Sequence, residues 1–87
     1  MSSLRERYLA EGIKNQLIAI QKSEQIYEKL SKWQRKALVM DEKQIEKVAN
    51  SIASKVEKYA SRIEAKTGNQ PDPKQVMAKI KEELDKI

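Results

Sequence analysis

The chain has 87 residues, the size of one small domain, so residues 1–87 are expected to form a single helical domain. It contains no cysteine and no histidine, which excludes disulfides and removes the usual zinc ligands and the commonest general base. The net charge is +5, and most of the surplus lies in residues 1–40, which carry eight basic and four acidic side chains.

A long first helix is predicted over residues 3–39. Ser3, with Glu6 three residues later, has the spacing of a capping box at a helix N-terminus. Apolar side chains then recur at helical spacing: Leu9, Ile13, Leu17, Ile20, Tyr27, Leu30 and Leu38. Ser23 and Glu24 interrupt this stripe, so a bend near residues 22–25 is an alternative to a straight helix.

A second helix is predicted over residues 42–67. Asp41 and Gln44 have capping-box spacing, and Gly68 can adopt the left-handed conformation that ends many helices. The charges of this helix are sorted. Lys47, Lys55, Lys58 and Arg62 lie on one side of its apolar stripe, whereas Glu46, Glu57 and Glu64 lie on the other. Such sorting can orient a neighbouring helix or a second subunit, but ordinary surface salt bridges are the favoured interpretation.

A short third helix is predicted over residues 73–87, with Asp72 as its cap and Pro73 in its first position. The fold class expected is therefore all-α, a bundle of three amphipathic helices. The main alternative fuses the first two helices, because no glycine or proline separates residues 39 and 41. The third helix is too short to cover the groove between the others, so some apolar surface should remain open near one end.

The sequence offers little catalytic chemistry. There is no glycine-rich loop that could bind a phosphate. The acidic pairs Glu24/Glu28 and Glu42/Glu46 have a spacing that could support a carboxylate metal site inside a bundle, but solvated surface carboxylates are the favoured interpretation. We therefore expect a non-enzymatic protein with no catalytic residues, no metal, no cofactor and no small-molecule substrate.

The apolar runs are short. The longest have four residues, at 17–20 and 37–40, whereas a membrane span needs about twenty apolar residues. A signal peptide needs an apolar stretch of about 7–15 residues. The expectation from the sequence is a cytoplasmic protein that has no membrane partner.

A basic face on the predicted first helix is the strongest functional signal. At about 100° per residue, six cations fall within roughly one quarter of that helix. They are Arg7, Lys14, Lys22, Lys29, Lys32 and Lys36. Such an array attracts phosphates without sequence preference, and Trp33 beside it would stack on a base if it were exposed. The first hypothesis is a small nucleic-acid-binding or regulatory protein that contacts DNA or RNA through this face.

Protein–protein interaction is the alternative hypothesis, and the sequence supports it nearly as well. A second apolar set lies off the main stripe of the first helix. It consists of Tyr8, Ile18, Ile26 and Trp33. A helix that buries two sides needs more than its own bundle to cover it, which favours a homodimer or a protein partner. The two hypotheses are compatible, because a dimer would display two basic faces.

Overall fold

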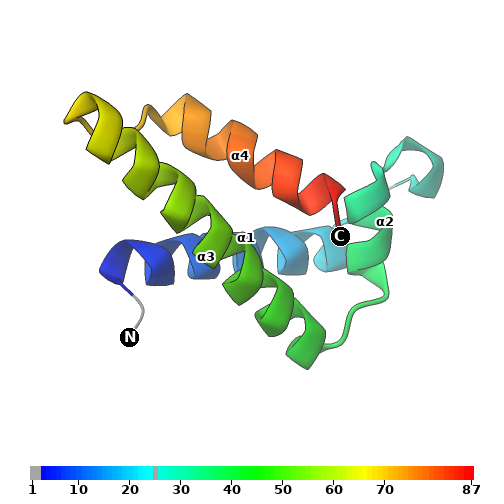
Figure 1. The fold of residues 1–87 in the computed structure, drawn as a ribbon. Helices are drawn as coiled ribbons and strands as arrows, with labels where there is room; N and C mark the ends of the chain where they lie inside the picture. Colours follow the sequence, from blue (N-terminus) through cyan, green and yellow to red (C-terminus); the bar gives the residue numbers. More distant parts are fainter. Residues whose placement is uncertain (1–2, 25) are drawn as a thin grey trace.

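Four α-helices and one 3-10 turn make up residues 3–24 and 26–87, the part of the chain described by a computed structural model (Figure 1). The elements are α1 (Leu4–Lys22), the 3-10 turn η1 (Tyr27–Lys29), α2 (Lys32–Leu38), α3 (Glu42–Thr67) and α4 (Pro73–Asp85). The predicted all-α class is confirmed, but the bundle has four helices rather than three.

The predicted boundaries of α3 and α4 are confirmed, because local capping sets them. At the start of α3, the Asp41 carboxylate accepts a hydrogen bond from the Gln44 N–H at 2.8 Å, and the Asp41 N–H donates to Gln44 Oε1 at 3.1 Å. Gly68 ends the helix in the left-handed conformation, with φ of 75°. Asp72 and Gln75 repeat the capping arrangement before α4, where the Asp72 N–H donates to Gln75 Oε1 at 3.2 Å.

The prediction of one helix over residues 3–39 is wrong. The helix begins as expected, since the Ser3 hydroxyl accepts a hydrogen bond from the Glu6 N–H, but it ends at Lys22. Ser23 has an extended backbone, with φ of −88° and ψ of 148°, so the chain leaves the helix there instead of bending within it. Residue 25, the end of the predicted bend, lies outside the described residues. The alternative fusion across residues 39–41 is also wrong, because α2 ends at Leu38.

The chain breaks because the segment after α1 folds back onto it. Gln21 Nε2 donates hydrogen bonds of 2.8 Å to the carbonyl oxygens of both Ala37 and Met40. Ala37 lies in the last turn of α2 and Met40 lies two residues beyond that helix, so this one side chain joins the end of α2 to α1. At the other end, the Ser31 N–H donates to Gln34 Oε1 at 2.9 Å, which completes one half of a capping box.

Arg35 and Leu30 stabilise the turn between α1 and α2. Arg35 donates to the carbonyl oxygens of Tyr27 and Glu28, at 3.2 and 3.1 Å, and its guanidinium lies 4.9 Å from the centroid of the Tyr27 ring. Leu30 is only 6% exposed, whereas Ile26, four residues earlier, is 60% exposed. In a continuous helix these two side chains would lie close to one face, so their different burial follows from the break.

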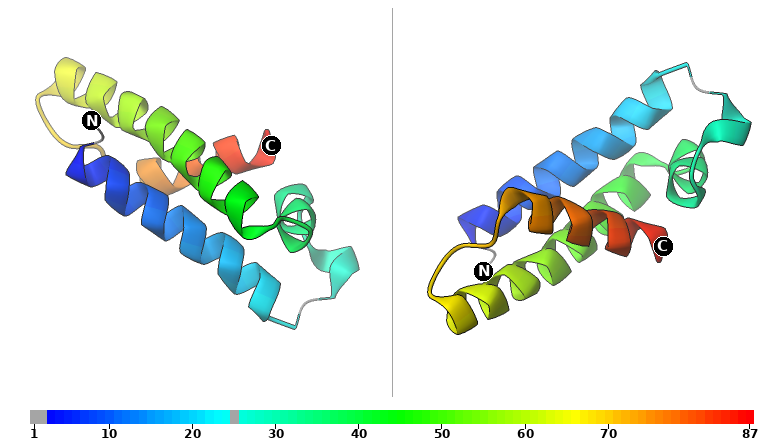
Figure 2. Two further views of the ribbon diagram at one scale, coloured as in Figure 1. Left: turned by 90° about the horizontal axis from the view of Figure 1, so that it is seen from below. Right: turned by 90° about the horizontal axis from the view of Figure 1, so that it is seen from above.

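The core lies where α1 and α3 run in opposite directions and α4 covers one side of the pair (Figure 2). The residues that line this core are apolar and come from all four helices: Ile13, Leu17, Ala37, Ile45, Ala49, Ile52, Ala53, Val56, Ile80 and Leu84. As expected from helix lengths, apolar surface stays open at one end. Leu9, Val76 and Met77 line a hollow of about 320 Å³ among α1, α3 and the start of α4, and this hollow is called the apolar groove below.

Replacing Leu30 and Ile26 separately with alanine tests the break in the first predicted helix. We expect Leu30→Ala to lower the free energy of unfolding by about 2–4 kcal/mol, because it leaves a cavity at a buried position. Ile26→Ala, the matched control, should change it by less than about 0.5 kcal/mol. Urea unfolding followed by circular dichroism measures both, and equal losses from the two variants would contradict the described turn.

Candidate functional site

The six cations of the predicted basic face do not lie on one continuous helix. The break distributes them over three elements: Arg7, Lys14 and Lys22 lie on α1, Lys29 lies on η1, and Lys32 and Lys36 lie on α2. The helical-wheel argument assumed a single continuous helix, so it fails once the chain leaves the helix at Ser23.

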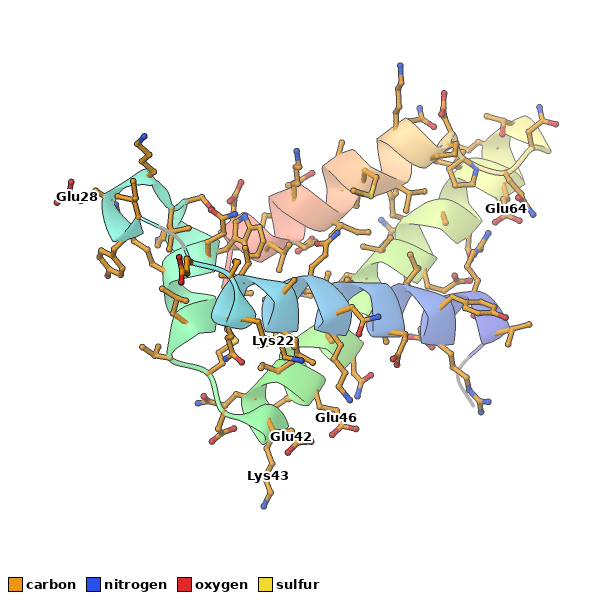
Figure 3. The ribbon with its side chains drawn as sticks, turned by 180° about the vertical axis from the view of Figure 1, so that it is seen from behind. Lys22, Glu28, Glu42, Lys43, Glu46 and Glu64 are labelled. Atoms are coloured by element: carbon orange, nitrogen blue, oxygen red, sulfur yellow. The ribbon has the colours of Figure 1, made fainter. Side chains whose placement is uncertain are left out.

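The cations on α1 also have acidic neighbours. Arg7 and Lys14 line a shallow hollow between α1 and α3 together with Glu11 and Glu46. Lys22 is exposed at the far end of the helix (Figure 3). Positive and negative charges therefore alternate along this side of the molecule, which weakens its attraction for a phosphate chain.

The residues predicted for protein contact fall into two groups. Tyr8 is 71% exposed, and Ile26 is also exposed, so both are available to a partner. Ile18 and Trp33 are half-buried and pack against the chain's own core. Trp33 was also the predicted base platform, and its packing against the core leaves only part of the indole accessible.

A basic surface that the sequence predicted only in part lies between α3 and α4 and is called the α3–α4 groove here. Two adjoining hollows of about 210 and 200 Å³ form it, and both are lined by Lys55 and Glu83. It has six cations: Lys47, Lys55, Lys58 and Arg62 from α3, Lys79 from α4, and Lys86 from the C-cap of α4. The four from α3 are those that the sequence placed on one side of its apolar stripe.

A buried carboxylate organises the middle of the α3–α4 groove. Glu83 is only 6% exposed, and its oxygens lie 3.5 Å from Lys79 Nζ, 3.7 Å from Lys86 Nζ and 3.9 Å from Lys55 Nζ. The three cations offset the cost of removing the Glu83 carboxylate from water. Together they leave a net positive charge around it. A sequence signal for Glu83 exists, because its spacing from Val76 and Ile80 places it on the inner face of α4.

Cations outnumber carboxylates within the groove. Its six cations lie with two carboxylates, Glu83 and the exposed Glu82, which is a local excess of four positive charges. Lys86 donates a hydrogen bond to Glu82 at 3.4 Å, which together with the charge of Lys79 lowers the pKa of Glu82. Lys79 Nζ also lies 5.5 Å from the centroid of the Tyr59 ring, which holds this ammonium at the groove.

The acidic side of α3 forms ion pairs with α1 of the same chain. Arg5 of α1 donates to Glu57 through Nε at 2.6 Å and through Nη2 at 2.9 Å, and it also pairs with Glu64. The hydrogen bonds from Arg5 lower the pKa of Glu57, and those to Glu57 and Glu64 raise the pKa of Arg5. Two of the acidic residues of α3 therefore pair with a neighbouring helix, which is one of the possibilities that the sequence left open.

The acidic pairs considered as metal ligands lie apart. Glu28 is at the tip of the turn after α1, whereas Glu42 and Glu46 lie at the start of α3 (Figure 3). Across residues 3–24 and 26–87, no three acidic side chains cluster in a way that could hold a metal ion. Within the same residues, no helix is both long enough and apolar enough to cross a membrane.

Comparison with known proteins finds no matching family, no similar curated protein and no solved structure with a significantly similar fold. The function is therefore argued from the surfaces of the chain itself.

Removing the Glu57 carboxylate tests the Arg5 ion pair. The folded pKa of Glu57 is lowered, so the pair contributes stability above the ordinary glutamate pKa and loses it as the pH falls through the folded value. We expect Glu57→Gln to lower the free energy of unfolding by about 0.5–1 kcal/mol near pH 7, since both side chains are partly exposed to solvent. This loss should shrink as the pH approaches about 3.

The measurement is urea unfolding followed by circular dichroism at both pH values. Glu46→Gln is the control, because Glu46 is an exposed carboxylate on the same side of α3 that lies eleven residues before Glu57 and lines the hollow with Arg7 and Lys14 rather than Arg5. A loss from Glu57→Gln that stays constant between the two pH values would contradict the role given to Arg5.

Proposed function

We propose that this chain is a non-enzymatic binding protein that holds nucleic acid through the phosphates, with the α3–α4 groove as its contact surface. The observation that carries the proposal is the gathering of six cations along one groove, where they outnumber the carboxylates by four. A localised positive surface attracts a polyanion by counterion release, without reading its sequence.

The dimensions of the groove suit a polymeric ligand. Lys47 and Arg62 mark its ends on α3, and at about 1.5 Å per residue they lie roughly 22 Å apart along the helix. Lys36 of α2 adjoins one end, because its Nζ donates to the carbonyl oxygen of Ile87, which lines the groove. One of the six cations predicted from the sequence thus borders this surface, and the proposal moves the contact from α1 to α3 and α4.

Charge reversal on α3 tests the contact surface. The triple variant Lys47→Glu, Lys58→Glu and Arg62→Glu changes exposed side chains only, so it should fold. We expect it to weaken binding to a labelled 20-nucleotide DNA at least tenfold at about 50 mM salt, as measured by fluorescence anisotropy. For the unaltered protein, an excess of four charges predicts a slope of log Kobs against log salt of about −3 to −4.

The matched control reverses the same number of charges on α1, as Arg7→Glu, Lys14→Glu and Lys22→Glu. The two triple variants have the same net charge, so a difference between them reports position rather than overall charge. If the α1 variant loses as much affinity as the α3 variant, the assignment to the α3–α4 groove is incorrect. A protein with no retention on DNA or RNA at low salt would refute the proposed function altogether.

Self-association is the second candidate function, and the apolar groove favours it. Met77 at the rim of that groove and Tyr8 on the outer side of α1 are both exposed, although each is large and apolar. A second copy that covers this end of the bundle would remove both side chains from water. Such a homodimer is compatible with the nucleic-acid proposal, because the α3–α4 groove lies on another side of α4.

Met77→Asp tests self-association, since a carboxylate at the rim would oppose burial of the groove against a second copy. We expect the variant to raise the dimer dissociation constant at least tenfold in sedimentation equilibrium. Val39→Asp is the control, because Val39 is exposed and lies on the segment between α2 and α3, outside the apolar groove. Unaltered protein that stays monomeric at millimolar concentration would rule this candidate out.

A further inference from the structure

The α3–α4 groove has cationic rims with apolar or aromatic surface between them, beside the buried Glu83, and together these features favour one class of nucleic acid. In the half nearest the start of α3, Val48, Ile52 and Ile87 form the floor between Lys47, Lys55 and Lys86. In the other half, Tyr59 lies among Lys58, Arg62 and Lys79. Cations therefore stand on both helices with apolar or aromatic surface between them.

The central cations are held in place before any ligand arrives. Glu83 is buried and lies within 3.9 Å of Lys55, Lys79 and Lys86, so it limits the freedom of all three ammonium groups. An ammonium has three donors, and one contact with Glu83 leaves the others for a phosphate oxygen. Binding of a phosphate then costs less side-chain entropy than it would on a surface of mobile lysines.

The floor distinguishes single strands from duplexes. A duplex keeps its bases stacked and paired inside, so its outer surface would bring phosphates to the rims and leave Val48, Ile52 and Ile87 facing sugar and water. A single strand can turn a base face toward the protein, and every base has a face that stacks on apolar or aromatic side chains. Only the single strand therefore gains from both the rims and the floor.

We propose that the α3–α4 groove binds single-stranded nucleic acid in preference to duplex, with phosphates on the lysine rims and a base over the floor formed by Val48, Ile52 and Ile87. This inference rests on the proposed function and names its ligand class. The groove is about 22 Å long, which fits the smallest site sizes of single-strand-binding folds, about four nucleotides. The rims and the floor contact phosphates and bases, which DNA and RNA share, so single-stranded DNA and RNA are expected to bind with similar affinity.

A competition between strands tests the preference. Labelled 20-nucleotide thymidine DNA, the matching uridine RNA and a 20-base-pair DNA duplex are titrated with the full chain at about 50 mM salt, and anisotropy is measured. We expect each single strand to bind at least fivefold more tightly than the duplex. Equal or tighter binding of the duplex overturns the inference while leaving the proposed function standing. Binding of none of the three overturns the proposed function as well.

A gain-of-function variant tests where the base lies and does not depend on weakening the fold. Ser51 is exposed and lines the groove beside the floor, whereas its neighbour Asn50 is exposed and lines the hollow between α1 and α3. Ser51→Trp adds a stacking surface at the groove and should tighten single-strand binding about fivefold or more, with little change for duplex. Asn50→Trp is the matched control and should alter neither. A larger effect from Asn50→Trp than from Ser51→Trp overturns the placement of the strand.

Discussion

The antiparallel packing of α1 against α3 is the contact on which the other elements depend. Ala49 and Ala53 are buried on α3, and their small side chains let α1 approach closely, so Ile13 and Leu17 are almost wholly excluded from water. Two helices alone cannot enclose this stripe, because each has only one neighbour to pack against. α4 and α2 cover what remains: α4 lies along one side, and α2 closes the end at which α1 stops. The basic surface between α3 and α4 is thus a consequence of how the core is covered.

Sequence reasoning succeeded where local chemistry sets the structure. The ends of α3 follow from Asp41 and Gly68, and each acts through its nearest neighbours, so a reader of the sequence can find them. The break after Lys22 was missed because residues 22–31 contain no glycine or proline and Leu30 stays in phase with the earlier stripe. Ser31 with Gln34 was a readable sign of a new helix, but the decisive contacts come from Gln21, which acts across 16 and 19 residues.

The candidate site was likewise predictable only where the geometry of one helix sets the positions of its residues. The cationic side of α3 could be predicted, because four charges on one helix need only its regular geometry. Its continuation onto α4 could not, since Lys79 and Lys86 join α3 only through the packing of the two helices and the buried Glu83. The predicted face on the first helix lost its structural basis for a related reason: adding up angles over thirty residues is valid only while every residue stays helical. Helical angles therefore predict a functional surface only where the helix is known to be continuous.

The hydrogen bonds of the Gln21 carboxamide bear on the order in which the helices of the chain fold together. It joins residues separated by 16 and 19 positions, whereas the Arg5–Glu57 pair joins residues 52 positions apart. Closing a shorter loop costs less chain entropy and happens sooner. We therefore expect the hairpin of α1 and α2 to form early in folding, held by the hydrogen bonds of Gln21. α3 then docks on a surface that is already in place, and the Arg5 pair marks the completion of that step.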